Sequence, residues 1–251
     1  MRLRAVNPLM TTLTCLAVLM CGPAQAQQFS SDNYLSKPHG VATIILTAGE
    51  RNDMFMTTFS LFRNWEFTAA AYTYHSADRT VDEGYSTSYY VKWMLYENKA
   101  KTGGLAVKFG TGMEPGYLGA YGLEDAFKTF WVNAPMTVPM FDNKLSWDIM
   151  PGASITYDYG PEEVTAAAFT YTTRLAWYPV SPKWSIVGEV YGSEGEVRAI
   201  PEYRVGLRWE PSQHAVVAVT YDDEFNGTNG GGFEIGVMLF TNPFACFKGC
   251  K

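Results

Sequence analysis

The sequence predicts an all-β fold, a single antiparallel transmembrane β-barrel of about 12 strands, within a range of about 10–14. Segments of about ten residues alternate between apolar and polar residues, and residues typical of turns separate them. Aromatic residues make up 15% of the chain and charged residues only 18%, against about 25% in typical soluble domains. Together these features favour strands that contact lipid on one face.

Residues 1–26 have the pattern of a signal peptide. Arg2 and Arg4 precede an apolar run over residues 9–20, and residues 24–26 (Ala-Gln-Ala) match an A-x-A cleavage site. A buried or membrane-spanning helix is the alternative, but the apolar run is short and ends in a cleavage site. We therefore expect an exported protein.

The chain after the signal peptide divides into three parts. We expect a loose, polar periplasmic entry segment at 27–40, the barrel at 41–241 and a short periplasmic tail at 242–251. Cys246 and Cys250 in the tail predict a disulfide if the compartment is oxidising, and two free thiols are the alternative.

Four segments show the alternation of a β-strand most clearly. In Glu202–Glu210, apolar or aromatic residues occupy every second position, and charged residues or Gly206 occupy the others. A helix with 3.6 residues per turn cannot keep two such faces separate. The other clear segments are Asn64–Tyr74, Tyr85–Tyr96 and Gly232–Phe240.

Weaker segments bring the expected number of strands to about twelve, and an even number is typical of single-chain bacterial barrels. They are Val41–Glu50, Met54–Phe62, Gly103–Thr111, Ala126–Thr137, Leu145–Tyr157, Val164–Tyr178, Trp184–Tyr191 and Ala215–Asp222.

Short and long connections alternate along these strands, as is typical of transmembrane barrels. The short ones are rich in Pro, Asn and Asp, as tight turns require, and we expect them on the periplasmic side. They lie at residues 63–64, 98–102, 139–144, 179–183 and 211–214. The longer, outward connections lie at residues 76–84, 112–125 and 226–231, and the short connection near residues 51–53 is an exception.

Trp and Tyr residues recur near the ends of the expected strands, which predicts aromatic girdles at the two membrane interfaces. The alternative is that they fill the core of a soluble β-protein. They are Trp65, Tyr74, Tyr85, Tyr96, Trp131, Trp177, Tyr178, Trp184 and Trp209.

The charged residues of the strands are expected to face the barrel interior, because a charge on the lipid face at mid-depth costs about 2–4 kcal/mol. The candidate lumen-lining residues are Glu66, Lys92, Lys108, Asp148, Arg174, Glu189, Arg204, Arg208 and Glu234, with Glu202 and Glu210 on the same face.

Acidic and basic residues are nearly balanced in this set, which leaves a salt-bridged, filled interior and a water-lined pore as alternatives. A barrel of about twelve strands encloses more space than the side chains of eight strands fill, so we expect a narrow pore or a partly occluded lumen. Arg174, Arg204 and Arg208 are the expected contacts for a solute or an anion, because their planar guanidinium groups bind carboxylates and phosphates. The alternative is that they pair only with neighbouring Glu residues.

The sequence predicts neither an enzyme nor a metal or cofactor site. His75-Ser76-Ala77-Asp78 combines a base, a nucleophile and an acid, but neighbours on a strand point to opposite faces. No G-x-S-x-G, H-E-x-x-H or P-loop motif is present. The acidic run at residues 222–224 has ligands suited to calcium, but such a run is more often a solvated loop.

The last expected strand carries Glu234-x-Gly236 followed by Leu239-Phe240, which resembles the sorting signal of outer-membrane barrels. The chain departs from that pattern because it continues to Lys251 and does not end on the aromatic residue. Over residues 41–240 the chain is similar to porin-like and transporter-like barrels of Gram-negative bacteria. The resemblance implies membrane lipid and lipopolysaccharide as neighbours, and the barrel-assembly machinery as a partner during insertion.

The expected function is therefore a narrow passive channel for small polar solutes in an outer membrane. A plugged structural or assembly-linked barrel and a soluble periplasmic ligand-binding β-barrel are the alternatives. The net charge of −6 and the lack of a basic patch argue against nucleic acid as a partner.

Overall fold

The alternating segments form antiparallel strands in the computed structural model, which describes residues 29–75, 84–114, 126–157, 165–196, 200–226 and 231–244. The signal peptide expected at residues 1–26 and the disulfide expected between Cys246 and Cys250 lie outside the described residues. No helix in the described part of the chain is long and apolar enough to cross a membrane.

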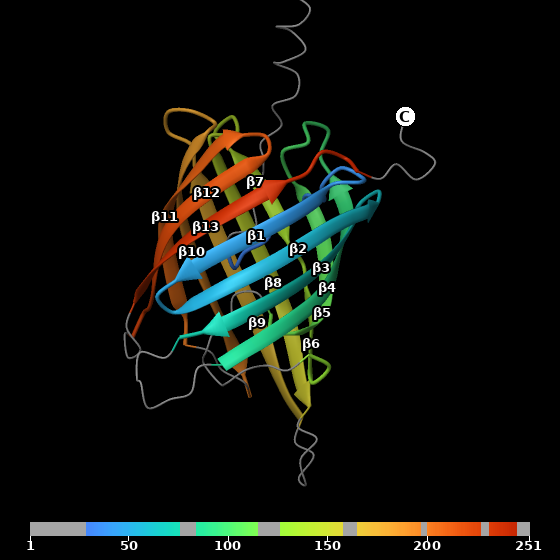
Figure 1. The fold of residues 1–251 in the computed structure, drawn as a ribbon, viewed down its shortest axis with the longest axis vertical. Helices are drawn as coiled ribbons and strands as arrows, with labels where there is room; N and C mark the ends of the chain where they lie inside the picture. The colour runs from blue at the N-terminus through green and yellow to red at the C-terminus, as the bar shows by residue number, and fades with distance from the viewer. Residues whose placement is uncertain are drawn as a thin grey trace, which may run out of the picture.

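The strands follow one another around a single sheet, and each pairs with its neighbours in the sequence except that β6 and β7 do not pair with each other (Figure 1). They are β1 (Ala42–Gly49), β2 (Asn52–Phe62), β3 (Trp65–Tyr74), β4 (Gly84–Glu97), β5 (Gly104–Gly112), β6 (Thr129–Asn133), β7 (Met136–Met140), β8 (Leu145–Tyr157), β9 (Thr165–Trp177), β10 (Trp184–Gly195), β11 (Glu202–Ser212), β12 (Ala215–Glu224) and β13 (Gly232–Phe240).

Pairing of β1 with β13 closes the sheet into a barrel, with Thr43 opposite Phe240. β6 and β7 form one barrel strand, because both pair with β5 on one side and with β8 on the other. The break between them contains Pro135, which has no N–H for the ladder, although its carbonyl accepts a hydrogen bond from the Ala106 N–H at 2.8 Å. The barrel therefore has 12 strands, as the sequence predicts.

Apart from the β1–β2 turn, the short connections lie together at one end of the barrel, named the turn end here, and the chain enters β1 and leaves β13 at this end (Figure 1). The opposite end is named the loop end. The β2–β3 turn contains Asn64 at φ 68°, a left-handed conformation that Asn tolerates better than most residues. β7 runs to Met140 because Pro139 lies opposite Ser146, so the next turn begins at Phe141 rather than at Pro139.

The outer surface of the barrel is apolar, and the inner surface carries the charges. Leu175 on β9 and Leu207 in the middle of β11, for example, are exposed, whereas their neighbours Arg174 and Arg208 are buried. This arrangement is the inverse of a soluble β-barrel, and it follows from the cost of placing a charge in lipid. The outer surface therefore fits the hydrocarbon layer of a membrane.

Aromatic side chains stack near the turn end of the outer surface. The ring centroids of Trp65 and Trp93 lie 5.1 Å apart, and those of Trp184 and Trp209 lie 5.5 Å apart. Trp131 does not belong to a girdle as expected, because it shares the inner face of β6 with Thr129 and Asn133. Its position along the chain is near a strand end, but the two-residue period of the strand turns it inward.

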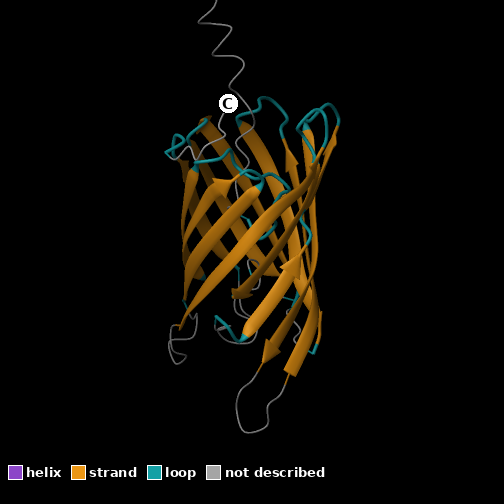
Figure 2. Cartoon of the chain, turned by 90° about the vertical axis from the view of Figure 1, so that its right-hand side faces the viewer, coloured by secondary structure: helices purple, strands orange, loops and turns teal. Residues whose placement is uncertain are grey.

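Residues 29–40 are named the lumen segment here; they run inside the barrel and reach its exposed turn end at Pro38 (Figure 2). The sequence suggested a loose entry segment at this position, yet Ser31, Asp32 and Tyr34 are at most 1% exposed. The difference has a physical reason. The segment is polar and lacks strand alternation, and its partners are wall residues that become neighbours only when the barrel closes.

Candidate functional site in the barrel lumen

The candidate lumen-lining residues are all buried inside the barrel, at exposures between 0% and 8%. The two-residue period of the strands places them on one face, and barrel closure turns that face inward. They are Glu66 on β3, Lys92 on β4, Lys108 on β5, Asp148 on β8, Arg174 on β9, Glu189 on β10, Arg204 and Arg208 on β11, and Glu234 on β13.

The arginines pair with carboxylates of the wall. Arg174 lies opposite Asp148 in the β8–β9 ladder, and its Nε and terminal nitrogen donate hydrogen bonds to Asp148 Oδ2 at 3.0 and 2.7 Å. Arg208 lies 2.8 Å from an oxygen of Glu210. In this structure Arg174 and Arg208 therefore pair with neighbouring acidic residues, which is the alternative to a role as solute contacts.

Arg204 lies at the centre of a larger acidic group. It is 3.1 Å from Asp222 and 3.9 Å from both Glu189 and Glu234, each on a different strand. Sequence analysis placed Asp222 in an acidic run at a strand end and missed this contact. The signal that identifies the contact is the β11–β12 register, in which Arg204 and Asp222 are directly opposite.

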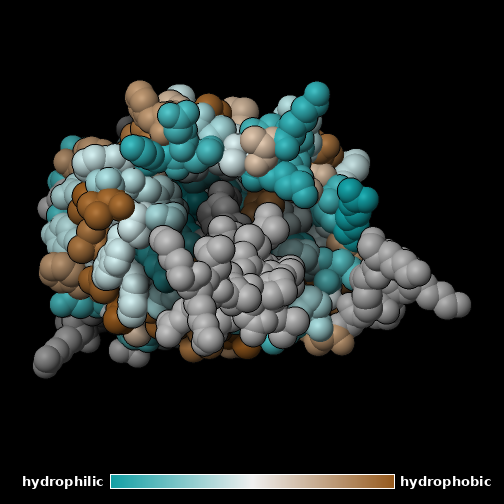
Figure 3. Space-filling model, turned by 90° about the horizontal axis from the view of Figure 1, so that it is seen from above, coloured by the Kyte–Doolittle hydropathy of each residue, from teal (hydrophilic) through white to brown (hydrophobic). Residues whose placement is uncertain are grey.

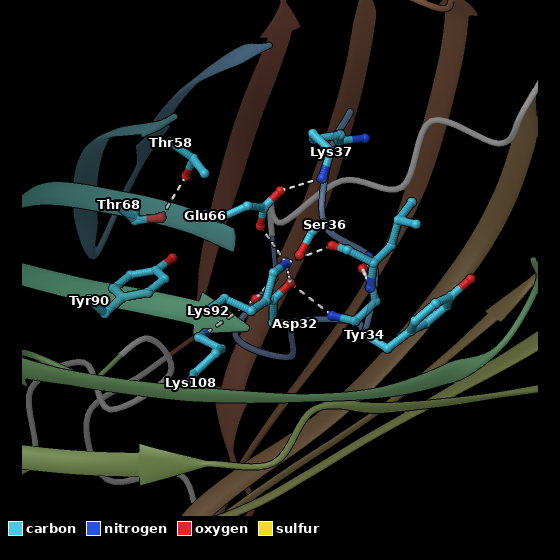
Figure 4. A network of polar contacts seen from close by, with 12 residues as sticks. Asp32, Tyr34, Ser36, Lys37, Thr58, Glu66, Thr68, Tyr90, Lys92 and Lys108 are labelled. Carbon is cyan, nitrogen blue, oxygen red and sulfur yellow. Dashed lines mark hydrogen bonds and ion pairs between the residues drawn. The ribbon is translucent and has the colours of Figure 1, made fainter. Parts of the chain in front are cut away.

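Two lysines form a second group with the lumen segment (Figure 4). Lys92 lies between Glu66 and Lys108 in the β3–β4–β5 ladder, and its Nζ is 2.7 Å from Glu66 Oε2. The Nζ atoms of Lys92 and Lys108 are each 3.4 Å from Asp32 Oδ2. Like charges directly opposite one another repel, so the Asp32 carboxylate offsets the repulsion between the two lysines.

Wall carboxylates also hold the backbone of the lumen segment. The N–H groups of Ser30 and Ser31 donate hydrogen bonds to the two carboxylate oxygens of Glu189. At the other end of the segment, the Lys37 N–H donates to Glu66 Oε1 at 2.6 Å. Sequence reasoning placed Glu189 and Glu66 in the lumen, but it had no signal that they bind the chain's own backbone.

The ammonium group of Lys108 lies beside aromatic rings of the inner wall. Its Nζ is 4.6 Å from the ring centroid of Tyr90 and 5.7 Å from that of Trp131. The two rings are 5.3 Å apart, so they form a continuous apolar surface next to the cation. Sequence analysis missed both rings as lumen residues, because it expected Trp131 in a girdle and Tyr90 shares its strand with many outward aromatics.

The inner wall carries hydroxyl groups that have no hydrogen-bond partner among the described residues. They belong to Thr47, Ser88, Thr172, Ser185 and Thr220, from five strands around the barrel. Between the lumen segment and the wall at Glu66 and Lys92, a cavity of about 20 Å³ remains, which is room for about one water molecule. Figure 3 looks onto the turn end and shows a recess lined by hydrophilic residues.

No group of three or more His, Cys, Asp or Glu residues in the described ranges is arranged to hold a metal ion. His75 Nε2 is 2.9 Å from Asp53 Oδ2 at the loop end, and Ser76 and Asp78 lie outside the described residues. The acids of the 222–224 run lie on β12, and Asp222 points to Arg204.

The fold is similar to solved structures of outer-membrane channels and porins. An outer membrane channel from Pseudomonas putida F1 has a TM-score of 0.55 at 11% identity, with 83% of this chain and 98% of that chain covered. The KdgM porin has a TM-score of 0.55 at 10% identity, with 79% of this chain and 98% of that chain covered. For the NanC porin the TM-score is 0.51 at 10% identity, with the same coverage of 79% and 98%.

The sequence matches no protein-family model and no curated protein. At the identities above, the structural likeness shows the fold alone. The chain therefore has the fold of outer-membrane barrels of the channel and porin type.

Proposed function

We propose that the chain is a narrow outer-membrane channel for small polar solutes, and that the lumen segment restricts its bore. The turn end is assigned to the periplasm and the loop end to the cell surface, because short turns are periplasmic in barrels of this kind. The signal-peptide pattern of residues 1–26 supports export to that membrane. The proposal gives the chain no catalytic group.

The inner-wall hydroxyl groups that lack a partner in the described part of the chain carry this proposal. An unsatisfied buried hydroxyl costs about 1–3 kcal/mol, so a dry, filled barrel would select against such groups. Water in the lumen satisfies them at no such cost. Their positions on β1, β4, β9, β10 and β12 place the water around much of the wall and not in one isolated cavity.

A plugged barrel is the second candidate, and the lumen segment is the observation that favours it. Ser30 to Asn33 are at most 4% exposed, and the cavity beside them holds about one water molecule. The channel reading requires solute to pass beside this segment or to displace part of it. Polar contacts hold the segment to the wall, such as those of the Ser30 and Ser31 N–H groups with Glu189, and Phe29 packs in an apolar cluster of the wall.

Single-channel conductance of the refolded chain in a planar bilayer tests the proposal. We expect discrete current steps. In Arg204→Ala, we expect the selectivity to shift toward cations, because the substitution leaves Asp222 and its acidic neighbours without their central positive charge. Lys99→Ala, an exposed position in the β4–β5 turn, is the control that changes net charge equally and leaves the selectivity unchanged.

The other outcomes separate the alternatives. A folded and inserted protein that carries no current supports the plugged barrel and contradicts the channel. A protein that leaves the cell envelope in buffer without detergent contradicts both, and it supports a soluble periplasmic ligand-binding protein.

A further inference from the structure

We propose that the loop-end half of the lumen is an entry site for small cationic solutes that carry an ammonium group, and that Glu234 is the residue that contacts this group. The inference rests on the proposed function, since it names the class of solute that the channel takes. It assigns the first contact to the end of the barrel that faces the cell surface.

The first step of the argument is the balance of the buried charges. Among the described residues, ten acidic side chains but only five basic ones are buried, so the interior has an excess of negative charge. A lumen lined mainly by one sign of charge concentrates the opposite ion. The acids are Asp32, Glu66, Glu114, Asp148, Glu189, Glu202, Glu210, Asp222, Glu224 and Glu234, and the bases are Lys92, Lys108, Arg174, Arg204 and Arg208.

The second step is the position of the excess along the barrel. Glu202, Asp222, Glu224 and Glu234 each lie within three residues of the loop-end terminus of β11, β12 or β13, and they are named the loop-end acids here. Glu202 and Glu224 are directly opposite one another in the β11–β12 ladder, where like charges repel. The cations in ion-pair contact with loop-end acids in the described part of the chain are Arg51 and Arg204. A further cation would therefore reduce the repulsion between these acids.

The third step is the weak internal pairing of Glu234. Its one ion-pair contact among the described residues is with Arg204 at 3.9 Å, which is too long for a hydrogen bond. Thr220 lies directly opposite Glu234 in the β12–β13 ladder. The Thr220 hydroxyl is buried and has no hydrogen-bond partner in the described ranges. A carboxylate and a hydroxyl on neighbouring strands are thus left for a hydrogen-bond donor from the lumen.

The fourth step is the kind of cation that fits. The cations that the loop-end acids accept in this structure are nitrogen cations, with Arg51 2.8 Å from Glu202 and Arg204 3.1 Å from Asp222. No group of three or more possible metal ligands is arranged around a common point in the described residues. An ammonium group carries three donors, so it can serve Glu234 and Thr220 and still keep a water molecule.

The loop-end acids are also within reach of solvent. The side chain of Arg51 beside them is 20% exposed, and that of Glu234 is 8% exposed. An ammonium group is close in size to a water molecule, so it needs no wider passage than water does.

Two measurements on single channels in a planar bilayer test the inference. The reversal potential in a KCl gradient gives the permeability ratio of K⁺ to Cl⁻, which we expect to be above unity for the wild type. Block of the current by putrescine is compared with that by 1,4-butanediol, which has the same chain and no charge. We expect putrescine to block at a lower concentration than the diol.

Three substitutions distinguish the site from general attraction by charge. Glu234→Gln is expected to raise the blocking concentration of putrescine about tenfold and to lower the permeability ratio. Thr220→Val removes the hydroxyl and no charge, so we expect it to raise the blocking concentration by a smaller factor with the permeability ratio unchanged. Asp142→Asn removes one negative charge at the exposed β7–β8 turn and is the matched control, with wild-type behaviour expected.

A wild-type channel that prefers Cl⁻, or equal effects of Glu234→Gln and Asp142→Asn, overturns the inference while the channel stands. If Glu234→Gln does not fold, the wild-type ratio and Thr220→Val still decide it. Silence of the folded and inserted wild type overturns the proposed function itself, so the two failures are distinguishable.

Discussion

At the scale of single residues, the charge of Asp32 is set by its two neighbours. Lys92 and Lys108 lie opposite one another across the β4–β5 ladder, and Asp32 reaches them from a segment 60 residues before Lys92. Burial raises the pKa of the Asp32 carboxyl. The two ammonium groups and the Asn33 N–H together lower this pKa by more than burial raises it. The resulting pKa lies below the ordinary value of 3.8.

This direction predicts how the channel responds to pH. A carboxyl whose pKa is lowered in the folded state adds stability above its ordinary pKa, and that stability is lost as the pH falls through the lowered value. We therefore expect Asp32 to stay ionised, and the difference in conductance between wild type and Asp32→Asn to be constant, from about pH 7 to about pH 5. Below about pH 3.8 we expect the wild-type conductance to approach that of Asp32→Asn, as Asp32 is protonated and releases the lysines.

Conductance steps of both proteins across a pH series measure this effect, with Asp32→Asn correcting for other groups that titrate in acid. A wild-type transition near neutral pH that is absent from Asp32→Asn would contradict the lowered pKa.

At the scale of the strand, glycines matter where two chains approach closely. Gly206 lies on the inner face of β11 between Arg204 and Arg208. A Cβ there would lie 2.4 Å from the backbone oxygen of Val219 on β12, which cannot move without shifting the ladder. A Cβ added to Gly188, on the neighbouring strand β10, would have no atom within 4 Å.

These two glycines form a matched pair for substitution. We expect Gly206→Ala to lower the free energy of unfolding by about 1–3 kcal/mol, because the new methyl group overpacks the β11–β12 contact. Gly188→Ala is expected to change it by less than about 0.5 kcal/mol. Urea unfolding in lipid vesicles measures both, and equal effects of the two substitutions would show that the close approach at Gly206 has no energetic weight.

At the scale of the whole molecule, the barrel separates an apolar exterior from a charged interior. This separation predicts that the effect of a charge depends on its depth in the membrane. Leu207 lies in the middle of β11 and Tyr85 near the loop end of β4, and both are exposed on the outer surface. Leu207→Arg therefore places a charge in hydrocarbon, whereas Tyr85→Arg places it near the interface.

We expect Leu207→Arg to lower the free energy of unfolding in lipid by about 2–4 kcal/mol and Tyr85→Arg by about 0–1 kcal/mol. The same unfolding measurement in vesicles compares them. If Leu207→Arg proved as stable as the wild type, the outer surface would face water, and the soluble alternative would replace the membrane barrel.

The sequence by itself determined the barrel and the inward face of the charges that were named as lumen-lining. The reason is local, because a strand has a period of two residues and each alternating segment assigns its own faces. Glu66, Lys92, Lys108 and Arg174 were therefore placed in the lumen without knowledge of their neighbours. The interruption at Pro135 does not change the number of barrel strands, because β6 and β7 both pair with β5 and form one barrel strand.

Only the tertiary structure decided what fills the lumen and which charges meet. Residues 29–40 have no alternation, and their partners Glu189 and Glu66 are 158 and 29 residues away along the chain in the contacts of Ser31 and Lys37. Such contacts depend on ladder register and barrel closure, which no local pattern encodes. Trp131 shows the same limit on a smaller scale, because one residue of shift along a strand moves a side chain from the membrane to the lumen.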